Sequence, residues 1–168
     1  MSKDKMFNTL YKDNYATVYR LCLSYVSGNN EIADDLVQEV FVKIWQNSDS
    51  FREESQISTW IYRITVNTCL MHLRKVKKLQ ERYTDEIPDL ANDDEDELKV
   101  EKLKLLRSCM HKLNEMGKIL ISLVLEDVSQ KEIAEIVGLT NENVRVKIHR
   151  NKGKLFKCIS SKEMQNTL

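Results

Sequence analysis

A run of basic side chains near the C-terminus is the clearest chemical feature of this sequence. Seven Lys or Arg residues and no Asp or Glu lie between Asn143 and Lys162. Cations along one helix can contact successive phosphates of a nucleic acid, whereas a solvated helical hairpin can carry the same charge without a ligand. Five of these seven residues lie within residues 129–155, and the pattern of that segment favours one of these two interpretations.

The spacing in this segment is that of a helix-turn-helix. Ser129 and Glu132 are predicted to form a capping box at the start of a first helix, and Gly138 supplies the turn that ends it. Ala134 allows a second helix to approach closely, and Thr140 is placed to cap that helix. Because these positions are all in register, the segment is predicted to bind duplex DNA.

The second helix of the motif is expected to turn one face to the core and the other to DNA. At about 100° per residue, Val144 and Ile148 point inward. His149 and Arg150 are then placed to read base edges, and Val146 to contact a thymine methyl group. With the flanking positions, the predicted duplex-contact residues are Thr140, Asn141, Glu142, Asn143, Arg145, Val146, Lys147, His149, Arg150, Lys152 and Lys154.

A second candidate nucleic-acid surface lies on a helix predicted over residues 58–78. Helical projection places on one side Trp60, Arg63, Asn67, Met71, Arg74 and Lys78. Aromatic rings stack on unpaired bases, amides discriminate base edges and cations hold phosphates. The same spacing also fits Trp60 and Tyr62 as ordinary core residues, so the spacing alone leaves both interpretations open.

A helix predicted over residues 31–46, with Asn30 as its N-cap, has an acidic side opposite its apolar stripe. That side shows Asp35, Gln38, Glu39 and Val42. An acidic patch around an exposed Val suits docking to a protein more than contact with DNA. A merely solvated face accounts for the pattern equally well.

Catalysis, a metal site and a cofactor are not predicted. The chain has three His and lacks a Ser-His-Asp arrangement, a Walker loop, GxGxxG and HExxH. Cys69 with His72, and Cys109 with His111, are half-sites that supply too few ligands for zinc. The four Cys are widely spaced without a CxxC pair, so they are expected to be reduced thiols.

These surfaces are expected on an all-α protein. One Pro and four Gly in 168 residues favour long helices. Apolar periodicity predicts helices over residues 5–27, 31–46, 58–78, 98–114, 117–126, 130–137 and 141–158. The sequence has no apolar run of the roughly 18 residues that a membrane span needs, and its first residues do not resemble a signal peptide. The protein is therefore expected to be cytoplasmic, without membrane insertion.

Charge divides the chain, although its formal net charge is zero. Residues 84–97 contain eight acidic residues, no basic residue and the single Pro, whereas residues 98–168 contain 14 basic and 8 acidic residues. Like charges resist compaction, so the acidic segment is predicted to be a flexible linker. The predicted organisation is two small helical domains, residues 1–82 and 98–160, joined by an acidic linker, 83–97, and followed by a polar tail, 161–168.

Two parts of the chain, one in each predicted domain, resemble two regions of a known family. DDLVQEVFVKIW and SFREESQISTWIYRITVNTCLMHLRK, within residues 34–75, resemble region 2 of bacterial sigma-70 family factors of the extracytoplasmic-function (ECF) group. The helix-turn-helix resembles region 4 of the same group. Together they span roughly residues 10–158. The resemblance implies a protein that joins core RNA polymerase and directs it to promoters.

The resemblance also implies roles for individual residues. The DDLVQEVF helix would dock on the clamp coiled coil of the largest polymerase subunit through Asp34, Asp35, Gln38, Glu39 and Val42. Loop 47–56 and the next helix would capture a flipped base of the minus-ten element. The minus-ten residues are then Phe51, Trp60, Tyr62, Arg63, Asn67, Met71, Arg74 and Lys75. The duplex-contact residues would hold the minus-thirty-five element, and the polymerase flap region and an anti-sigma factor are further implied partners.

The sequence departs from the family pattern at three places. Met71 stands where many members have Asp, Asn114 stands where Pro is common, and Asp127-Val128-Ser129 replaces the frequent Gly-Leu-Ser. Met71 bears most directly on minus-ten selection. The alternative function is a stand-alone helix-turn-helix regulator whose N-terminal domain senses a signal or dimerises. A nucleic-acid enzyme would need catalytic residues that the sequence does not offer.

Overall fold

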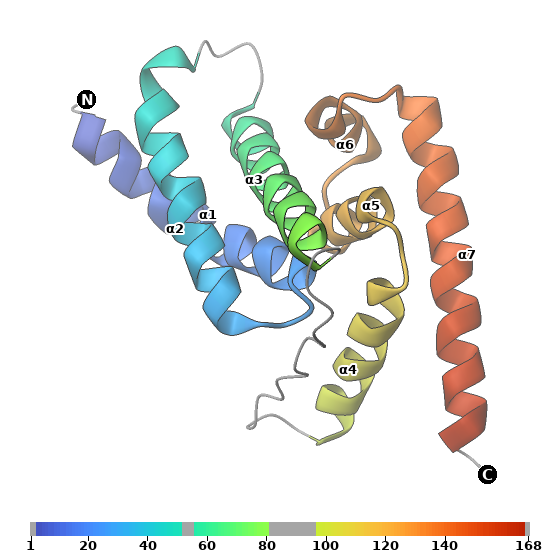
Figure 1. The fold of residues 1–168 in the computed structure, drawn as a ribbon. Helices are drawn as coiled ribbons and strands as arrows, with labels where there is room; N and C mark the ends of the chain where they lie inside the picture. The colour runs from blue at the N-terminus through green and yellow to red at the C-terminus, as the bar shows by residue number, and fades with distance from the viewer. Residues whose placement is uncertain (1–2, 52–55, 81–96, 167–168) are drawn as a thin grey trace.

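The computed structural model describes residues 3–51, 56–80 and 97–166, and the regular elements of these residues are all helical (Figure 1). The elements are α1 (Lys3–Tyr25), α2 (Asn30–Asn47), the 3-10 turn η1 (Ser48–Ser50), α3 (Ile57–Gln80), α4 (Glu97–His111), α5 (Glu115–Leu125), α6 (Gln130–Val137) and α7 (Asn141–Asn166). The all-α prediction is therefore confirmed. None of the helices in the described part of the chain is long and apolar enough to cross a membrane.

Helices α1, α2 and α3 pack on one another and form the N-terminal module. The apolar stripe of α2 is buried, as its periodicity predicts. Aromatic rings extend the core along α1, where Phe7 lies 5.1 Å from Trp45 and Tyr11 lies 4.6 Å from Phe41 between ring centroids. Because only the apolar side of α2 packs into this core, the opposite, polar side of the helix is exposed to solvent.

The cap of α2 differs by one residue from the prediction. Asn29 is the N-cap, and its side chain accepts a hydrogen bond of 3.1 Å from the Ile32 amide. Asn30 instead accepts a hydrogen bond of 3.0 Å from the Tyr19 hydroxyl of α1. Two consecutive Asn residues offer the same capping group, and contact with α1 decides which of them caps the helix.

Helices α4 to α7 form the C-terminal module, in which the predicted helix-turn-helix is confirmed as α6 and α7. Ser129 and Glu132 form the capping box, and Gly138 ends α6 with a φ of 69° in the left-handed region. Thr140 accepts a hydrogen bond of 3.2 Å from the Asn143 amide at the start of α7. Helix α7 continues to Asn166, beyond the predicted end at 158, so most of the expected polar tail is helical.

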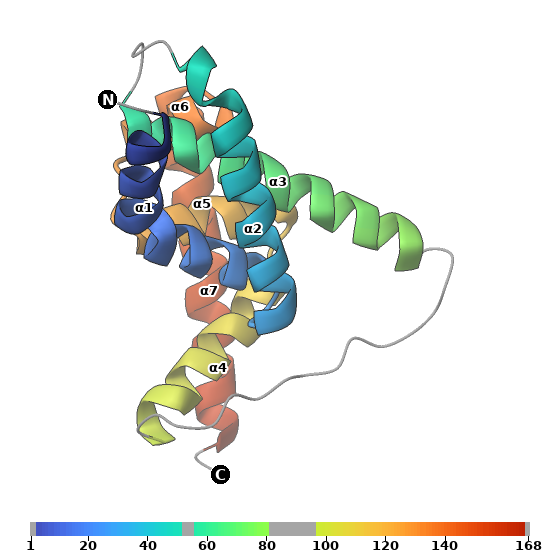
Figure 2. The same cartoon turned by 90° about the vertical axis from the view of Figure 1, so that its left-hand side faces the viewer.

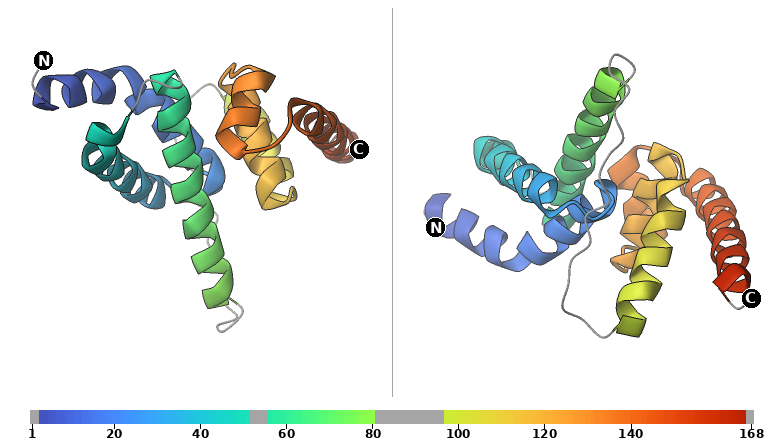
Figure 3. Two further views of the ribbon diagram at one scale, coloured as in Figure 1. Left: turned by 90° about the horizontal axis from the view of Figure 1, so that it is seen from above. Right: turned by 60° about the horizontal axis from the view of Figure 1, so that its bottom comes forward.

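The two modules pack against each other through one continuous apolar core. Ile119, Leu123 and Ile133 of the C-terminal module are buried in the same cluster as Val18 and Val66 of the N-terminal module. Figure 3 shows α5 and α6 lying between the N-terminal module and α7. Nearly all of the acidic segment 84–97, predicted to be a flexible linker, lies outside the described residues; Glu97 already belongs to α4.

A second, smaller core lies between α4 and α7 and contains a disulfide. Cys109 and Cys158 are bonded, with their Cα atoms 5.8 Å apart. The expectation of reduced thiols is therefore wrong for this pair, whereas Cys22 and Cys69 are free and buried. Helices α4 and α7 pack side by side and bring together residues that are 49 positions apart, a proximity that the spacing of cysteines along the chain does not reveal.

Candidate nucleic-acid and polymerase interfaces

The recognition face of α7 is presented to solvent by the packing of its opposite face. Val144, Ile148 and Leu155 are buried against the rest of the C-terminal module. All of the predicted duplex-contact residues, from Thr140 to Lys154, are exposed. The 3.6-residue period thus places cations and polar side chains on the outer surface, as predicted.

A shallow hollow lies on this outer face. Arg145, Val146, His149 and Arg150 line it, and its volume is about 340 Å³. Arg side chains can donate two hydrogen bonds to a guanine edge, and an exposed Val can contact a thymine methyl group. The hollow therefore combines polar and apolar side chains of types suited to base contacts on one surface.

A close approach between α5 and α7 fixes the position of the recognition helix. Gly117 of α5 faces Asn151 of α7, and a Cβ atom at Gly117 would lie 2.6 Å from the Asn151 Oδ1 atom. Asn114 caps α5 by accepting a hydrogen bond of 2.8 Å from the Gly117 amide. A side-chain cap at Asn114 thus begins α5.

The first minus-ten candidates meet at the start of α3. The rings of Phe51 and Trp60 lie 5.3 Å apart between centroids, and both side chains are half-buried. Trp60 packs partly against the core, so the surface and core interpretations of this residue each hold in part. Four residues of the loop, 52–55, lie outside the described part of the chain.

The second half of α3 extends away from the other helices (Figure 2). The candidates on this half are exposed: Asn67, Met71, Arg74 and Lys75. Helix α3 contains no Asp or Glu, so no acidic side chain of its own neutralises these cations. An amide and several cations on a projecting helix can reach a nucleic acid without displacing another element.

Tyr62 and Arg63, the two remaining minus-ten candidates, face the C-terminal module. The Arg63 Nη2 atom donates a hydrogen bond of 2.7 Å to the backbone carbonyl of Glu135 on α6. Tyr62 is half-buried, and burial raises the pKa of its hydroxyl. The structure therefore divides the predicted minus-ten surface into an open part and a part that contacts α6.

Further polar contacts join the two modules, and sequence reasoning did not identify them. The guanidinium of Arg20 pairs with both carboxylate oxygens of Glu126 at 2.8 Å. The hydroxyls of Ser24 and Ser122 are also hydrogen-bonded to each other. The sequence did contain one signal for contact between the modules. Helix α5 is apolar on nearly all sides, a pattern typical of a helix that is surrounded by other elements.

Another inter-module contact joins α4 to the turn between α1 and α2. Ser27 and the His111 Nδ1 atom are hydrogen-bonded at 3.0 Å. Burial, followed by the charge of Lys118, lowers the pKa of His111. The neutral imidazole is therefore favoured at this contact.

The candidate polymerase surface on α2 is exposed as predicted. Asp34, Asp35, Gln38, Glu39 and Val42 all lie on the side away from the core. Val42 is 53% exposed, a high value for an apolar side chain in the middle of a helix. Lys43 pairs with Glu39 at 2.6 Å and also contacts Thr68 of α3. The result is an acidic surface with an apolar centre.

Neither of the two sequence half-sites for a metal is completed in the fold. The sulfur of Cys109 is bonded to Cys158, and the Cys69 thiol donates to the Cys22 sulfur at 3.8 Å. No group of three or more His, Cys, Asp or Glu residues suited to a metal ion occurs in the described ranges.

Comparison with known proteins identifies two regions of this chain. Residues 10–79 match the family described as Sigma-70 region 2, and residues 103–155 match Sigma-70, region 4. The chain is 33% identical over 143 residues to the RNA polymerase sigma factor SigV of Bacillus subtilis, covering 84% of each chain. It is also 33% identical over 159 residues to the ECF RNA polymerase sigma-E factor of Haemophilus influenzae, covering 87% of this chain and 83% of that one.

Two solved structures share the fold. One is the sigma factor RpoE in complex with the anti-sigma factor NepR from Bartonella quintana, with a TM-score of 0.79, 19% identity, and coverage of 93% of this chain and 98% of that one. The other is CnrH in complex with the cytosolic domain of CnrY, with a TM-score of 0.69, 21% identity, and coverage of 94% and 90%.

The two matched regions, in this order, define the class of RNA polymerase sigma factors. This chain belongs to the ECF group of that family. Its function is to bind core RNA polymerase and direct promoter-specific transcription initiation. A stand-alone helix-turn-helix regulator would leave the match to region 2 without an explanation.

Proposed function

We propose that three helices divide the work of this sigma factor. The exposed face of α2 binds the clamp coiled coil of the largest polymerase subunit, α3 binds the minus-ten element with residues Phe51 to Lys75, and α7 binds the minus-thirty-five element. The observation that carries this assignment is on α7, where every predicted duplex-contact residue is exposed while the opposite face is buried. An exposed row of cations and base-reading side chains is what a major groove accepts.

The α2 surface has the properties of a protein-docking site. Its carboxylates surround Val42, and a patch of this kind gains affinity from apolar burial and orientation from charge. DNA would be repelled by the same carboxylates. Residues 1–82 are accordingly assigned to region 2, 83–97 to the acidic linker, 98–160 to region 4 and 161–168 to the tail.

The contact between α3 and α6 must open when the protein binds a promoter. The minus-ten and minus-thirty-five elements are about 25 base pairs apart, which is about 85 Å along B-form DNA. Arg63 of α3 is hydrogen-bonded to Glu135 of α6, so the two candidate DNA-binding modules are in direct contact. One duplex cannot present both elements to modules in this arrangement, and core polymerase is the partner that holds them apart.

The closed arrangement also supports an anti-sigma partner for this chain. RpoE in complex with NepR is similar over 93% of this chain, which includes both modules. An anti-sigma factor that keeps the modules together would block access of polymerase and of promoter DNA. The protein acts in the cytoplasm, contacts the polymerase flap region through region 4 and carries out no catalysis of its own.

Reconstituted transcription tests this function. The full chain is added to core RNA polymerase from the same organism together with fragmented genomic DNA, and the RNA starts are sequenced. We expect starts that share sequence elements about 10 and 35 base pairs upstream. Retention of DNA binding without association with core polymerase would contradict the proposal. A failed shift assay without polymerase would not, because the proposal has core polymerase hold the two modules apart for promoter binding.

A further inference from the structure

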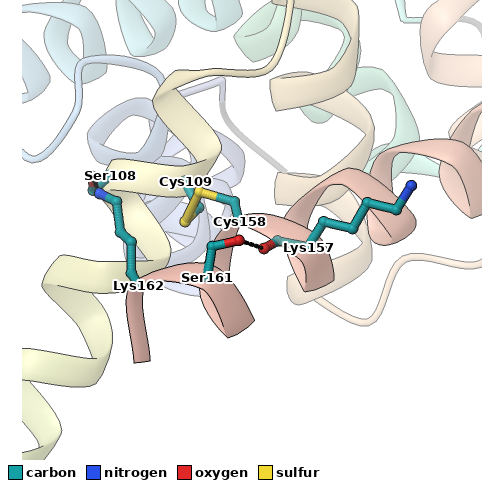
Figure 4. Close-up of a disulfide and its surroundings, with 6 residues drawn as sticks. All are labelled: Ser108, Cys109, Lys157, Cys158, Ser161 and Lys162. Atoms are coloured by element: carbon teal, nitrogen blue, oxygen red, sulfur yellow. Dashed lines mark hydrogen bonds between the residues drawn. A yellow bond between two sulfur atoms is a disulfide. The ribbon is translucent and has the colours of Figure 1, made fainter. Parts of the chain in front are cut away.

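The disulfide between Cys109 and Cys158 covalently encloses the helix-turn-helix (Figure 4). The bond joins α4 to the second half of α7, and the enclosed loop contains α5, α6 and the recognition half of α7. A cross-link across a loop of this length restricts the unfolded chain and therefore favours the folded one. The bond thus acts on the unit that is proposed to bind the minus-thirty-five element.

The C-terminal module has a small core of its own. In the closed arrangement, Leu120, Leu123 and Ile133 are buried in the core that both modules share. The separate cluster between α4 and α7 consists of Cys109, Met110, Leu113, Ile121 and Leu155, with partly buried neighbours. When the modules part, the C-terminal module loses the apolar cover of the N-terminal one. A helical domain of this size is marginal without extra stabilisation.

Cys158 is accessible to solvent, in contrast to its buried partner Cys109 and to the other two cysteines. Cys158 is partly exposed, whereas Cys22 and Cys69 are both buried to within 1% of full coverage. Lys162 lies one helical turn after Cys158 and reaches Ser108, the neighbour of Cys109 (Figure 4). An accessible thiol near an ammonium group is more reactive than one in an apolar interior.

We propose that Cys109 and Cys158 are a reversible oxidative modification site that stabilises the open, promoter-bound form of the C-terminal module. A sigma factor works beside the chromosome, where thiols are kept reduced and a disulfide is usually transient. The oxidant is a hydroperoxide. Oxidation strengthens transcription from promoters that depend on the minus-thirty-five element, and reduction weakens it. This consequence for transcription rests on the proposed function, whereas the thiol chemistry does not.

The reaction balances in two steps. The Cys158 thiolate attacks one oxygen of hydrogen peroxide, the O–O bond breaks, and Cys158 becomes a sulfenic acid as the released hydroxide takes up a proton to form water. The Cys109 thiolate then attacks the Cys158 sulfur, the S–S bond forms as the S–O bond breaks, and the released hydroxide takes up a proton to form a second water. Two thiols are oxidised by two electrons, and one peroxide is reduced to two waters. A dithiol reverses the bond by exchange.

The first experiment measures the chemistry alone, on the full chain. The protein is reduced, treated with hydrogen peroxide or with buffer, denatured in acid, and labelled with a maleimide that adds a known mass. We expect four labelled thiols before oxidation and two after it, with Cys109 and Cys158 protected in the peptide map. The Cys158→Ser variant should form no intramolecular bond, while Cys69→Ala should still form it. Protection of Cys22 and Cys69 instead, or no protection, overturns the proposal.

The second experiment measures the consequence. Oxidised protein should melt at least about 5 °C above reduced protein. Holoenzyme made with oxidised protein should also give at least about fivefold more transcript from a minus-thirty-five-dependent template. Both differences should vanish in Cys158→Ser and in Cys109→Ser. If the chain supports no transcription in either state, the proposed function fails, yet the labelling and melting results still decide whether the site exists. Equal melting temperatures in the two states would overturn the stabilising effect.

Discussion

Arg63 of α3 donates a hydrogen bond of 2.7 Å to the backbone carbonyl of Glu135 on α6. One candidate minus-ten residue is therefore engaged by the helix-turn-helix that is proposed to hold the other end of the promoter. The contact links the two modules in their closed arrangement, together with the pairing of Arg20 and Glu126. On the proposed role of Arg63 in minus-ten binding, opening and promoter binding are coupled, because the same side chain cannot serve both contacts.

Reversal of the charge at Arg20 should favour the open arrangement. The Arg20→Glu variant replaces an attraction of about 1 kcal/mol, the usual upper value for a partly exposed pair, with a repulsion from Glu126. The radius of gyration in small-angle X-ray scattering should increase. The double variant Arg20→Glu with Glu126→Arg should restore the closed value, and Lys12→Glu on the same helix is a control. A double variant as open as the single one would show that the pair does not hold the modules together.

Removal of the Arg150 side chain should weaken duplex binding. Arg150→Ala loses the guanidinium at the hollow on α7, and a specific base contact of this kind is worth about 1–3 kcal/mol. Binding of the holoenzyme to a minus-thirty-five duplex should fall by the corresponding factor and become less dependent on salt. Lys112→Ala removes an exposed cation outside α7 and should leave this binding unchanged. An unchanged affinity for Arg150→Ala would remove Arg150 from the recognition surface.

The Asn67→Ala substitution should impair promoter opening with little effect on the minus-thirty-five contact. The side chain is exposed on α3, where its amide is placed to discriminate an unpaired base edge. Permanganate reactivity of thymines near the start site should decrease, while duplex binding by α7 persists. Asn8→Ala, an exposed amide on α1, serves as the matched control. Normal opening by the variant would argue against a role for Asn67 in minus-ten recognition.

Val42→Arg should abolish most of the binding to core RNA polymerase. The substitution places a cation at the exposed apolar centre of the α2 surface, where Val42 is 53% exposed. We expect at least about a tenfold loss of affinity, since an apolar anchor at an interface centre contributes about 2 kcal/mol. Leu125→Arg, at a position that is 55% exposed, is the matched control. Should both variants bind polymerase equally well, the docking surface lies elsewhere.

Two glycine substitutions should have opposite effects on stability. Gly117→Ala places a Cβ atom 2.6 Å from the Oδ1 atom of the buried Asn151 side chain, so this side chain or the helices must shift, at a cost of about 1–3 kcal/mol. Gly153→Ala meets nothing within 4 Å and should stabilise α7 by about 0.5–1 kcal/mol. Urea unfolding of the reduced proteins measures both changes. Equal stability of the two variants would contradict the close packing at Gly117.

The candidate surfaces on single helices were predictable from the sequence. The capping box at Ser129 and Glu132, the turn at Gly138 and the outward face of α7 all depend on residues within a few positions of one another. The same holds for the exposed face of α2 around Val42. Helical periodicity and cap chemistry act over these short distances, so the chain alone determines them.

Tertiary structure decided how these helices meet. The Arg63 contact spans 72 residues, and the pairing of Arg20 with Glu126 spans 106. The disulfide between Cys109 and Cys158 spans 49. No local period or spacing encodes a contact of this kind, because it arises only when separate apolar faces pack into one core. The sequence by itself determined which faces could bind DNA and polymerase; the packing decided that Tyr62 and Arg63 face the C-terminal module in the closed arrangement.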